Sequence, residues 1–142
     1  MIVPDVNLLL YAEVDAFPQH RRACAWWEGL LSGDQRVGLA PVALFGFVRL
    51  GTNRRVFSEP LAVGAALARV RAWLEQPNVS VLVPGTDHLA IAFRLLEGLG
   101  TAANLTTDVQ LAAHAIEHGG AVHSNDRDFG RFDGLRWVDP LA

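Results

Sequence analysis

The chain opens with Met1–Leu10, MIVPDVNLLL, and this stretch decides how the rest of the sequence is interpreted. It starts with the short apolar run of a buried strand, which ends at Asp5, and an apolar segment with helical character begins at once. In open α/β sheets, ligands bind in the crevice outside the carboxyl ends of the strands. Asp5 is therefore a candidate site residue, although an acid at this point is equally typical of a helix cap.

Length and composition indicate a folded globular protein. The chain has 142 residues, of which 51% are hydrophobic and 19% charged, enough for one sizeable core. No apolar run approaches the ~20 residues that a membrane-spanning helix needs. The N-terminus does not resemble a signal peptide, and a single cysteine, Cys24, excludes an internal disulfide. We therefore expect a cytoplasmic protein with no membrane partner.

The net charge of −3 argues against a nucleic-acid partner, because such proteins usually carry a basic surface. A bound cation would weaken this objection by neutralising several acids. All 12 basic residues are arginines, which suit bidentate phosphate contacts, although a GC-rich genome explains the missing lysines better. The absence of lysine excludes receiver and haloacid-phosphatase domains, since both need a lysine in their acidic sites.

Apolar periodicity predicts strands that alternate with helices. Helices are expected over residues 6–13, 19–32, 42–50, 61–75, 87–99 and 106–118, and strands over residues 2–4, 37–40, 79–83, 121–123 and 135–138. The helix over 42–50 is apolar nearly all round, which predicts a buried helix, and Thr106 or Thr107 is expected to cap the last helix. This alternation predicts an α/β fold with a small central parallel sheet flanked by α-helices, in a single domain over residues 1–142.

Four acids fall where the carboxyl edge of such a sheet is expected. Asp5 follows the first strand, Asp126 and Asp128 follow the strand over 121–123, and Asp108 lies in the first turn of a helix. If the fold brings them together, their mutual repulsion raises pKa values unless a cation is bound. Hard carboxylate ligands suit Mg²⁺ or Mn²⁺, which can activate water and offset charge in phosphodiester hydrolysis. Each acid taken alone is more typical of a helix cap or a solvated surface charge.

Four segments carry a resemblance to a known family. They are VPDVNLLLYA over residues 3–12, LFGFVRLGTN over 44–53, NLTTD over 104–108 and SNDRDF over 124–129. With these segments in this order, the chain resembles PIN-domain ribonucleases, and among them the VapC toxins of bacterial type II toxin–antitoxin systems. The ending LRWVDPL over residues 135–141 is similar to a mycobacterial-type branch.

The resemblance implies a PIN-like fold and an Mg²⁺-dependent endoribonuclease, with Mn²⁺ as a substitute ion. It implies cleavage of structured RNA, with tRNA or rRNA as the usual target, by a toxin that pairs with a cognate antitoxin and forms a homodimer. The alternative is a catalytically weak or inactive PIN-like module that binds RNA or a partner. That alternative rests on Gly46, which stands where most PIN nucleases carry a glutamate.

The resemblance also implies roles for individual residues. Asp5 and Asp108 would be metal ligands, Asp126 would complete the acidic cluster directly or through water, and Asp128 would be an auxiliary catalytic member. Asn7 would hold the Asp5 loop. Thr107 would orient Asp108 or a metal-bound water.

Other residues carry weaker expectations from their own positions. Glu13 or Asp15 would replace the missing carboxylate only if the first helix turned them inward, and ordinary surface acids are the preferred interpretation. Arg49 is expected to reach either the acidic cluster or an RNA phosphate. Arg54 and Arg55 are the best candidates for contact with the RNA backbone, although an ordinary solvated loop explains them equally well.

His114 and His118 are four residues apart on one expected helix, the spacing of a zinc-binding pair. The glutamate of a His-Glu-x-x-His motif is absent and no third ligand is evident. We therefore interpret them as a pair on the surface of a helix.

Overall fold

The computed structural model describes residues 1–142, and its five strands form one parallel sheet. The strands are β1 (Ile2–Pro4), β2 (Val37–Leu39), β3 (Val79–Val81), β4 (Ala121–His123) and β5 (Arg136–Val138). Their order across the sheet is β3-β2-β1-β4-β5, so β1 lies in the centre and pairs with β2 on one side and β4 on the other. The predicted α/β fold with a central parallel sheet is confirmed.

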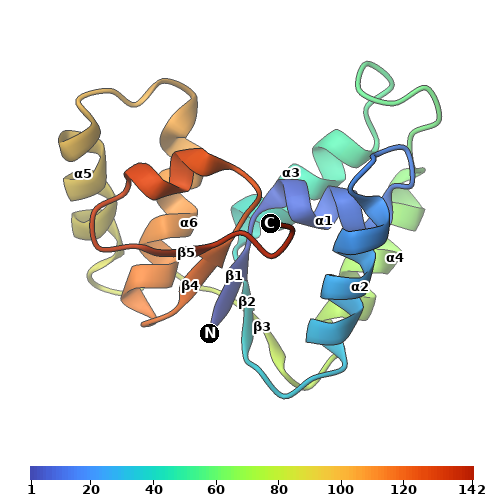
Figure 1. Cartoon of the computed structure of the whole chain (residues 1–142), viewed down its shortest axis with the longest axis horizontal. Coiled ribbons are helices and arrows are strands. Elements are labelled where there is room, and N and C mark those ends of the chain that lie inside the picture. The colour runs from blue at the N-terminus through green and yellow to red at the C-terminus, as the bar shows by residue number, and fades with distance from the viewer.

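Six α-helices flank the sheet (Figure 1). They are α1 (Val6–Glu13), α2 (His20–Leu31), α3 (Pro41–Gly51), α4 (Val63–Leu74), α5 (His88–Leu99) and α6 (Thr106–Glu117). Two short 3₁₀ helices, η1 (Ala103–Leu105) and η2 (Arg127–Arg131), precede α6 and follow β4. In Figure 1, α5 and α6 lie on one side of the strands and α1–α4 on the other. None of these helices is long and apolar enough to cross a membrane.

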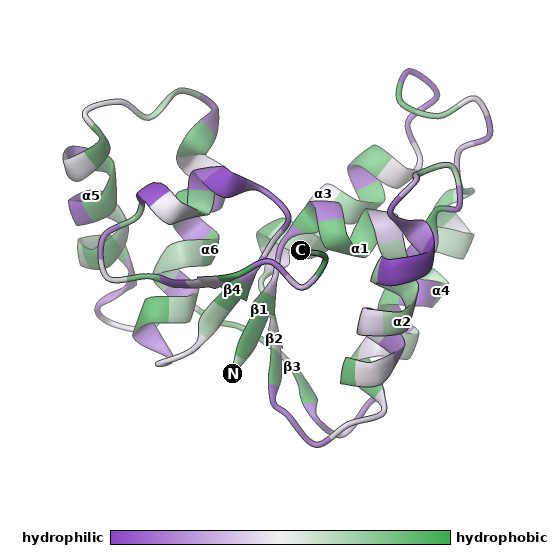
Figure 2. Ribbon diagram, in the orientation of Figure 1, coloured by the Kyte–Doolittle hydropathy of each residue, from purple (hydrophilic) through white to green (hydrophobic).

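The core lies between the central strands and the helices. β1 and β2 are buried along their whole length and mostly green in Figure 2, as expected for strands covered on both faces. On the α1–α4 side, the core is aromatic. The Trp73 ring packs on Trp27 with centroids 5.5 Å apart and on Phe47 with centroids 4.9 Å apart. These contacts hold α2, α3 and α4 together.

Two local expectations were wrong. Helix α3 is not buried all round, because Phe45 is 74% exposed and Arg49 is also exposed, while Ala43, Gly46 and Phe47 face the core. No threonine caps α6, because η1 leads directly into the helix and no side chain makes a capping hydrogen bond. A run of apolar residues does not by itself show which face of a helix packs against other elements and which face stays exposed.

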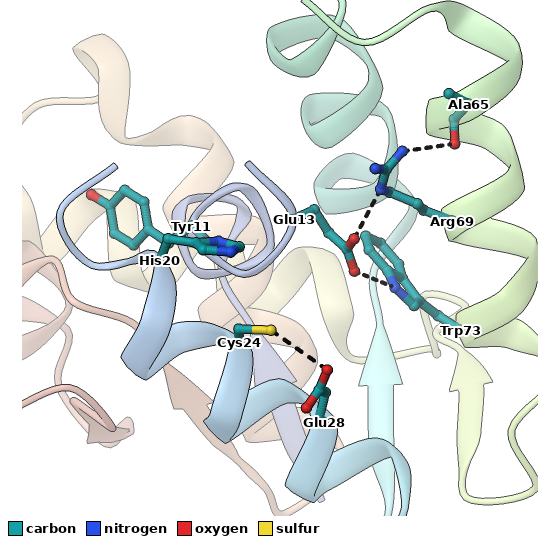
Figure 3. A network of polar contacts seen from close by, with 8 residues as sticks. All are labelled: Tyr11, Glu13, His20, Cys24, Glu28, Ala65, Arg69 and Trp73. Carbon is teal, nitrogen blue, oxygen red and sulfur yellow. Dashed lines mark hydrogen bonds and ion pairs between the residues drawn. The ribbon is translucent and has the colours of Figure 1, made fainter. Parts of the chain in front are cut away.

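Glu13 does not point toward the acidic edge of the sheet. Its Oε2 pairs with Arg69 Nε at 2.9 Å, and its Oε1 accepts a hydrogen bond from Trp73 Nε1 at 3.2 Å (Figure 3). This half-buried contact ties α1 to α4. Asp15 lies exposed in the turn after α1. Neither acid therefore replaces the carboxylate that is missing at Gly46.

Two buried histidines hold α5 against α6. The rings of His88 and His114 have centroids 4.3 Å apart, and the two residues are only 5% and 4% exposed. His114 is therefore not part of a helix-surface pair, which corrects the sequence-based interpretation. Glu117 at the end of α6 adds a second link to α5. Its carboxylate accepts hydrogen bonds from the backbone N–H groups of Gly85 and Asp87, just before α5 begins. Burial lowers the pKa of His114 to about 4, with His88 and His118 adding to the effect.

The low pKa of His114 predicts acid sensitivity of the α5–α6 contact. Between the unfolded pKa of 6.5 and the folded value of about 4, the unfolded chain binds more protons, so stability falls as the pH decreases. We expect a His114→Leu variant to lose less free energy of unfolding than the wild type between about pH 7 and pH 5 in denaturant titrations. Equal losses in the two proteins would contradict this assignment.

Candidate active site

The site lies where the chain changes direction across the sheet. After β1 the chain continues through α1 and α2 to β2, whereas β4 is reached from α5 and α6 on the other side. Such a switch point between neighbouring parallel strands leaves a crevice at their carboxyl ends. Asp5 follows β1, and its backbone N–H donates to the carbonyl oxygen of His123 at the end of β4 at 3.0 Å. The two strand ends are thus held side by side.

A pocket of about 780 Å³ opens at this switch point. Its polar lining contains residues that the sequence singled out: Asp5, Asn7, Arg49, Thr107, Asp108 and Asp126. Its apolar wall comes from Val6 on α1 and from residues of α3: Val42, Phe45, Gly46, Val48 and Leu50. The structure therefore brings three of the four predicted catalytic carboxylates to one pocket.

Asp5 is buried, with 5% of its surface exposed. Ser124 Oγ, which is fully buried, donates to Asp5 Oδ2 at 2.8 Å and accepts from the backbone N–H of Asp126 at 2.9 Å. Burial raises the pKa of Asp5, although the hydrogen bond from Ser124 and the backbone N–H groups of Val6 and Asn7 oppose this shift. Ser124 was not assigned a role from the sequence, and its place in the segment SNDRDF was the only signal that pointed to it.

Asp108 lies in the first turn of α6, where the helix dipole favours an anion. Its pKa is nevertheless raised to about 7, first by burial and then by repulsion from Asp5, Asp126 and Asp128. The carboxyl group is therefore partly protonated at neutral pH, and a bound cation would favour its charged form.

Asp128 lies at the margin of this cluster and does not line the pocket. Its side chain is 50% exposed, and its nearest cation is Arg131 Nη1 at 3.9 Å. Its backbone N–H donates to Asp126 Oδ1 at 2.9 Å, so that Asp126 caps η2 with one oxygen. Asp128 acts on the pocket through its charge, which contributes to the raised pKa of Asp108.

The donor set suits a hydrated divalent cation. No group of three His, Cys, Asp or Glu side chains is placed closely enough to enclose a metal ion. Mg²⁺ does not need such a cage, because it usually binds through one or two carboxylates and keeps several waters. The oxygen ligands fit this mode of binding, and so does the raised pKa of Asp108, to which repulsion from the other carboxylates contributes after burial.

Gly46 has a packing role. A Cβ atom at this position would lie 3.0 Å from Val6 Cγ2 and 3.4 Å from Val6 Cγ1, closer than most side chains approach. The glycine therefore allows α3 to pack directly against α1 beside Asp5. A glutamate would begin with the same Cβ atom, so it would require Val6 to move.

The three candidate RNA-contacting arginines occupy two places. Arg49 is exposed on α3, lines the pocket and forms no ion pair. Arg54 and Arg55 lie exposed in the turn after α3, outside the pocket, where the backbone N–H of Arg55 donates to Asn53 Oδ1 at 2.9 Å. Only Arg49 is thus adjacent to the carboxylates.

Comparison with known proteins identifies the class to which this fold and site belong. The PIN domain family model matches residues 2–135, and the chain therefore belongs to the PIN-domain family. Within that family it belongs with the VapC ribonucleases. It is 57% identical over 141 residues to Ribonuclease VapC33 of Mycobacterium tuberculosis, with 99% of each chain covered.

Solved structures share the fold at low sequence identity. VapBC-1 from nontypeable Haemophilus influenzae matches with a TM-score of 0.71 and 18% identity over the whole of both chains. Mycobacterium tuberculosis VapC20, described as a toxin that cleaves the sarcin-ricin loop, matches with a TM-score of 0.66 and 19% identity, covering 96% of this chain and 99% of that one. These likenesses confirm the PIN-type arrangement of strands and helices.

The crowding of carboxylates around Asp108 predicts how metal-free protein responds to pH. The folded state binds the extra proton, because the pKa of Asp108 is raised from 3.8 to about 7, so stability falls as the pH rises through this range. At about pH 8 an Asp108→Asn variant should melt at a higher temperature than the wild type, and near pH 4 this advantage should disappear.

Magnesium supplies the matched test of that prediction. Adding Mg²⁺ at about pH 8 should raise the melting temperature of the wild type but not that of Asp108→Asn, because only the wild type gains a cation between its carboxylates. Asp34→Asn, in an exposed loop after α2, is the control and should respond to Mg²⁺ as the wild type does. A wild type that is insensitive to both pH and Mg²⁺ would contradict a crowded acidic cluster.

The contact between Gly46 and Val6 predicts a coupled pair. Gly46→Ala should lower the free energy of unfolding, because overpacking costs about 1–3 kcal/mol against a helix-propensity gain of about 1 kcal/mol. In a Val6→Ala background the same change should become neutral or stabilising. Gly29→Ala on α2, where a Cβ meets no atom within 4 Å, is the control and should be stabilising. Equal effects of Gly46→Ala in both backgrounds would exclude the contact as the cause.

Proposed function

We propose that this chain is a divalent-metal-dependent endoribonuclease that acts in the cytoplasm as the toxin of a toxin–antitoxin pair. The observation that carries the proposal is the convergence of Asp5, Asp108 and Asp126 on one pocket, with the pKa of Asp108 raised to about 7. Kinship with Ribonuclease VapC33 supports RNA as the substrate. We propose Mg²⁺ as the ion, with Mn²⁺ as a substitute, in a single nuclease domain over residues 1–142.

In the proposed site, Asp5 and Asp108 hold the ion, and Asp126 completes the set directly or through water. The chemistry that Mg²⁺ would supply when held there is activation of water and neutralisation of charge on the phosphodiester. Ser124 positions Asp5 through its hydrogen bond at 2.8 Å. Burial of Asp5 strengthens its attraction to a cation, since charges interact more strongly away from solvent.

The remaining polar residues around the pocket have supporting roles in the proposal. Asn7 and Thr107 line the pocket beside the carboxylates. Asn7 would hold the Asp5 loop, and Thr107 would orient Asp108 or a water bound to the ion. Asp128 adds negative charge from the rim. Arg49 contacts an RNA phosphate next to the scissile bond, and the exposed Arg54 and Arg55 contact the RNA backbone further away.

Structured RNA, either tRNA or rRNA, is the proposed substrate class. The VapC20 structure, whose toxin is described as cleaving the sarcin-ricin loop, supports an rRNA target for the shared fold. The VapBC-1 structure supports a cognate antitoxin as the partner. A homodimer is proposed from the family resemblance.

The alternative is a weak or inactive PIN-like module that binds RNA or a partner. Its support was the glycine at position 46. The packing of Gly46 against Val6 gives that glycine a structural reason, which favours the nuclease.

Cleavage of RNA by the chain freed of antitoxin tests the proposed function. Cellular RNA should be cut in the presence of Mg²⁺ or Mn²⁺ and left intact in EDTA, and sequencing the new ends should identify tRNA or rRNA sites. Asp108→Asn should lose more than about 100-fold of the activity, since even outer-shell partners of a metal often contribute about 10- to 100-fold.

The control variant is again Asp34→Asn, which makes the same chemical change outside the pocket and should cut like the wild type. A wild-type chain that binds RNA but cuts none with either ion would support the inactive module instead.

A further inference from the structure

Phe45 is the most exposed of the large hydrophobic side chains, with 74% of its surface accessible. It projects from α3, lines the pocket that holds Asp5, Asp108 and Asp126, and makes none of the aromatic contacts that the core phenylalanines make. The fold therefore does not need this ring for packing. An exposed aromatic ring in a pocket with catalytic acids is placed to meet a ligand.

The neighbouring residue leaves room beside the ring. Gly46 contributes no side chain to the pocket wall, and a Cβ atom there would lie 3.0 Å from Val6 Cγ2, so that Val6 would have to move. Apart from Phe45, Gly46 and Arg49, the residues that α3 presents to the pocket are aliphatic: Val42, Val48 and Leu50. The carboxylates thus face an open, apolar wall in which Phe45 is the only aromatic ring.

One helical turn after Phe45, Arg49 presents a positive charge to the same pocket. Residues four apart lie on one face of a helix, and the Arg49 guanidinium forms no ion pair with an acid of the chain. An aromatic ring and an unpaired guanidinium on one face match the flat base and the anionic phosphate of a nucleotide.

We propose that Phe45 is a stacking platform for an unpaired nucleobase next to the scissile phosphodiester, while Arg49 contacts the adjacent phosphate. The inference rests on the proposed ribonuclease function and specifies its substrate: RNA that presents unstacked bases, as loops do, and not continuous duplex. Bases in an A-form helix are stacked on each other and cannot offer a free face to the ring.

Binding of hairpin RNAs that carry 2-aminopurine at one loop position at a time tests the proposal. With Asp108→Asn in every protein, the RNA is bound without being cut. The protein with Phe45 should quench the fluorescence of 2-aminopurine at one or two loop positions. This quenching should persist with Phe45→Tyr and disappear with Phe45→Leu. Stacking on one base predicts that Phe45→Leu weakens hairpin binding by about 5- to 100-fold. Binding to a fully paired duplex should not change.

Cleavage with Asp108 intact gives the second measurement, and Phe45→Leu should raise the KM for the hairpin more than it lowers kcat. Phe93→Leu is the matched control, because Phe93 is 56% exposed on α5 and does not line the pocket. It should leave binding, quenching and cleavage unchanged.

Three results would overturn the proposal in distinguishable ways. Unimpaired cleavage and quenching by Phe45→Leu would remove the stacking platform and leave the ribonuclease in place. Unchanged RNA binding combined with lost binding of the co-expressed antitoxin would assign Phe45 to a protein interface. If the wild type cut no RNA, the proposed function would fail, and the platform with it.

Discussion

The structure depends on the parallel pairing of β1 with β4, which a buried hydrogen bond completes at the strand ends. Ser124 Oγ lies 2.8 Å from Asp5 Oδ2, and both side chains are almost wholly removed from water. A carboxylate left unpaired at this depth would be costly, whereas a hydroxyl donor and nearby backbone N–H groups offset part of that cost. The bond holds Asp5 toward the pocket and also orders the start of the Asp126 segment.

The acidic side chains at the ends of β1 and β4 and at the start of α6 repel one another at the proposed site. The charges of Asp5, Asp126 and Asp128 act on Asp108 and, together with burial, raise its pKa to about 7. Glu13, by contrast, is matched by Arg69 and Trp73. Carboxylates gathered in one pocket are typical of a functional site, because packing alone gives no reason to keep them together.

Helix α3 shows how one element can serve the core and the pocket together. Ala43 and Phe47 are fully buried, Gly46 allows α1 to approach, and Phe45 and Arg49 face the pocket. Replacing a glutamate by glycine at position 46 changes more than the number of carboxylates. The glycine also lets α3 pack closely against Val6 of α1 and leaves the wall beside Phe45 without a side chain, so that the apolar side of the pocket becomes part of the proposed substrate site.

Local patterns were enough to predict the class of fold and each candidate acid separately. Alternating strand and helix periods specify an α/β sheet, and an acid directly after a buried strand, as at Asp5, marks the edge where ligands bind. Those patterns are properties of neighbouring residues. Other features depend on how distant segments meet. They are the convergence of Asp5 with Asp108 and Asp126, the role of Ser124, the pairing of Glu13 and the exposure of Phe45. They follow from the order of the strands and from which helix faces meet, and no local periodicity encodes either.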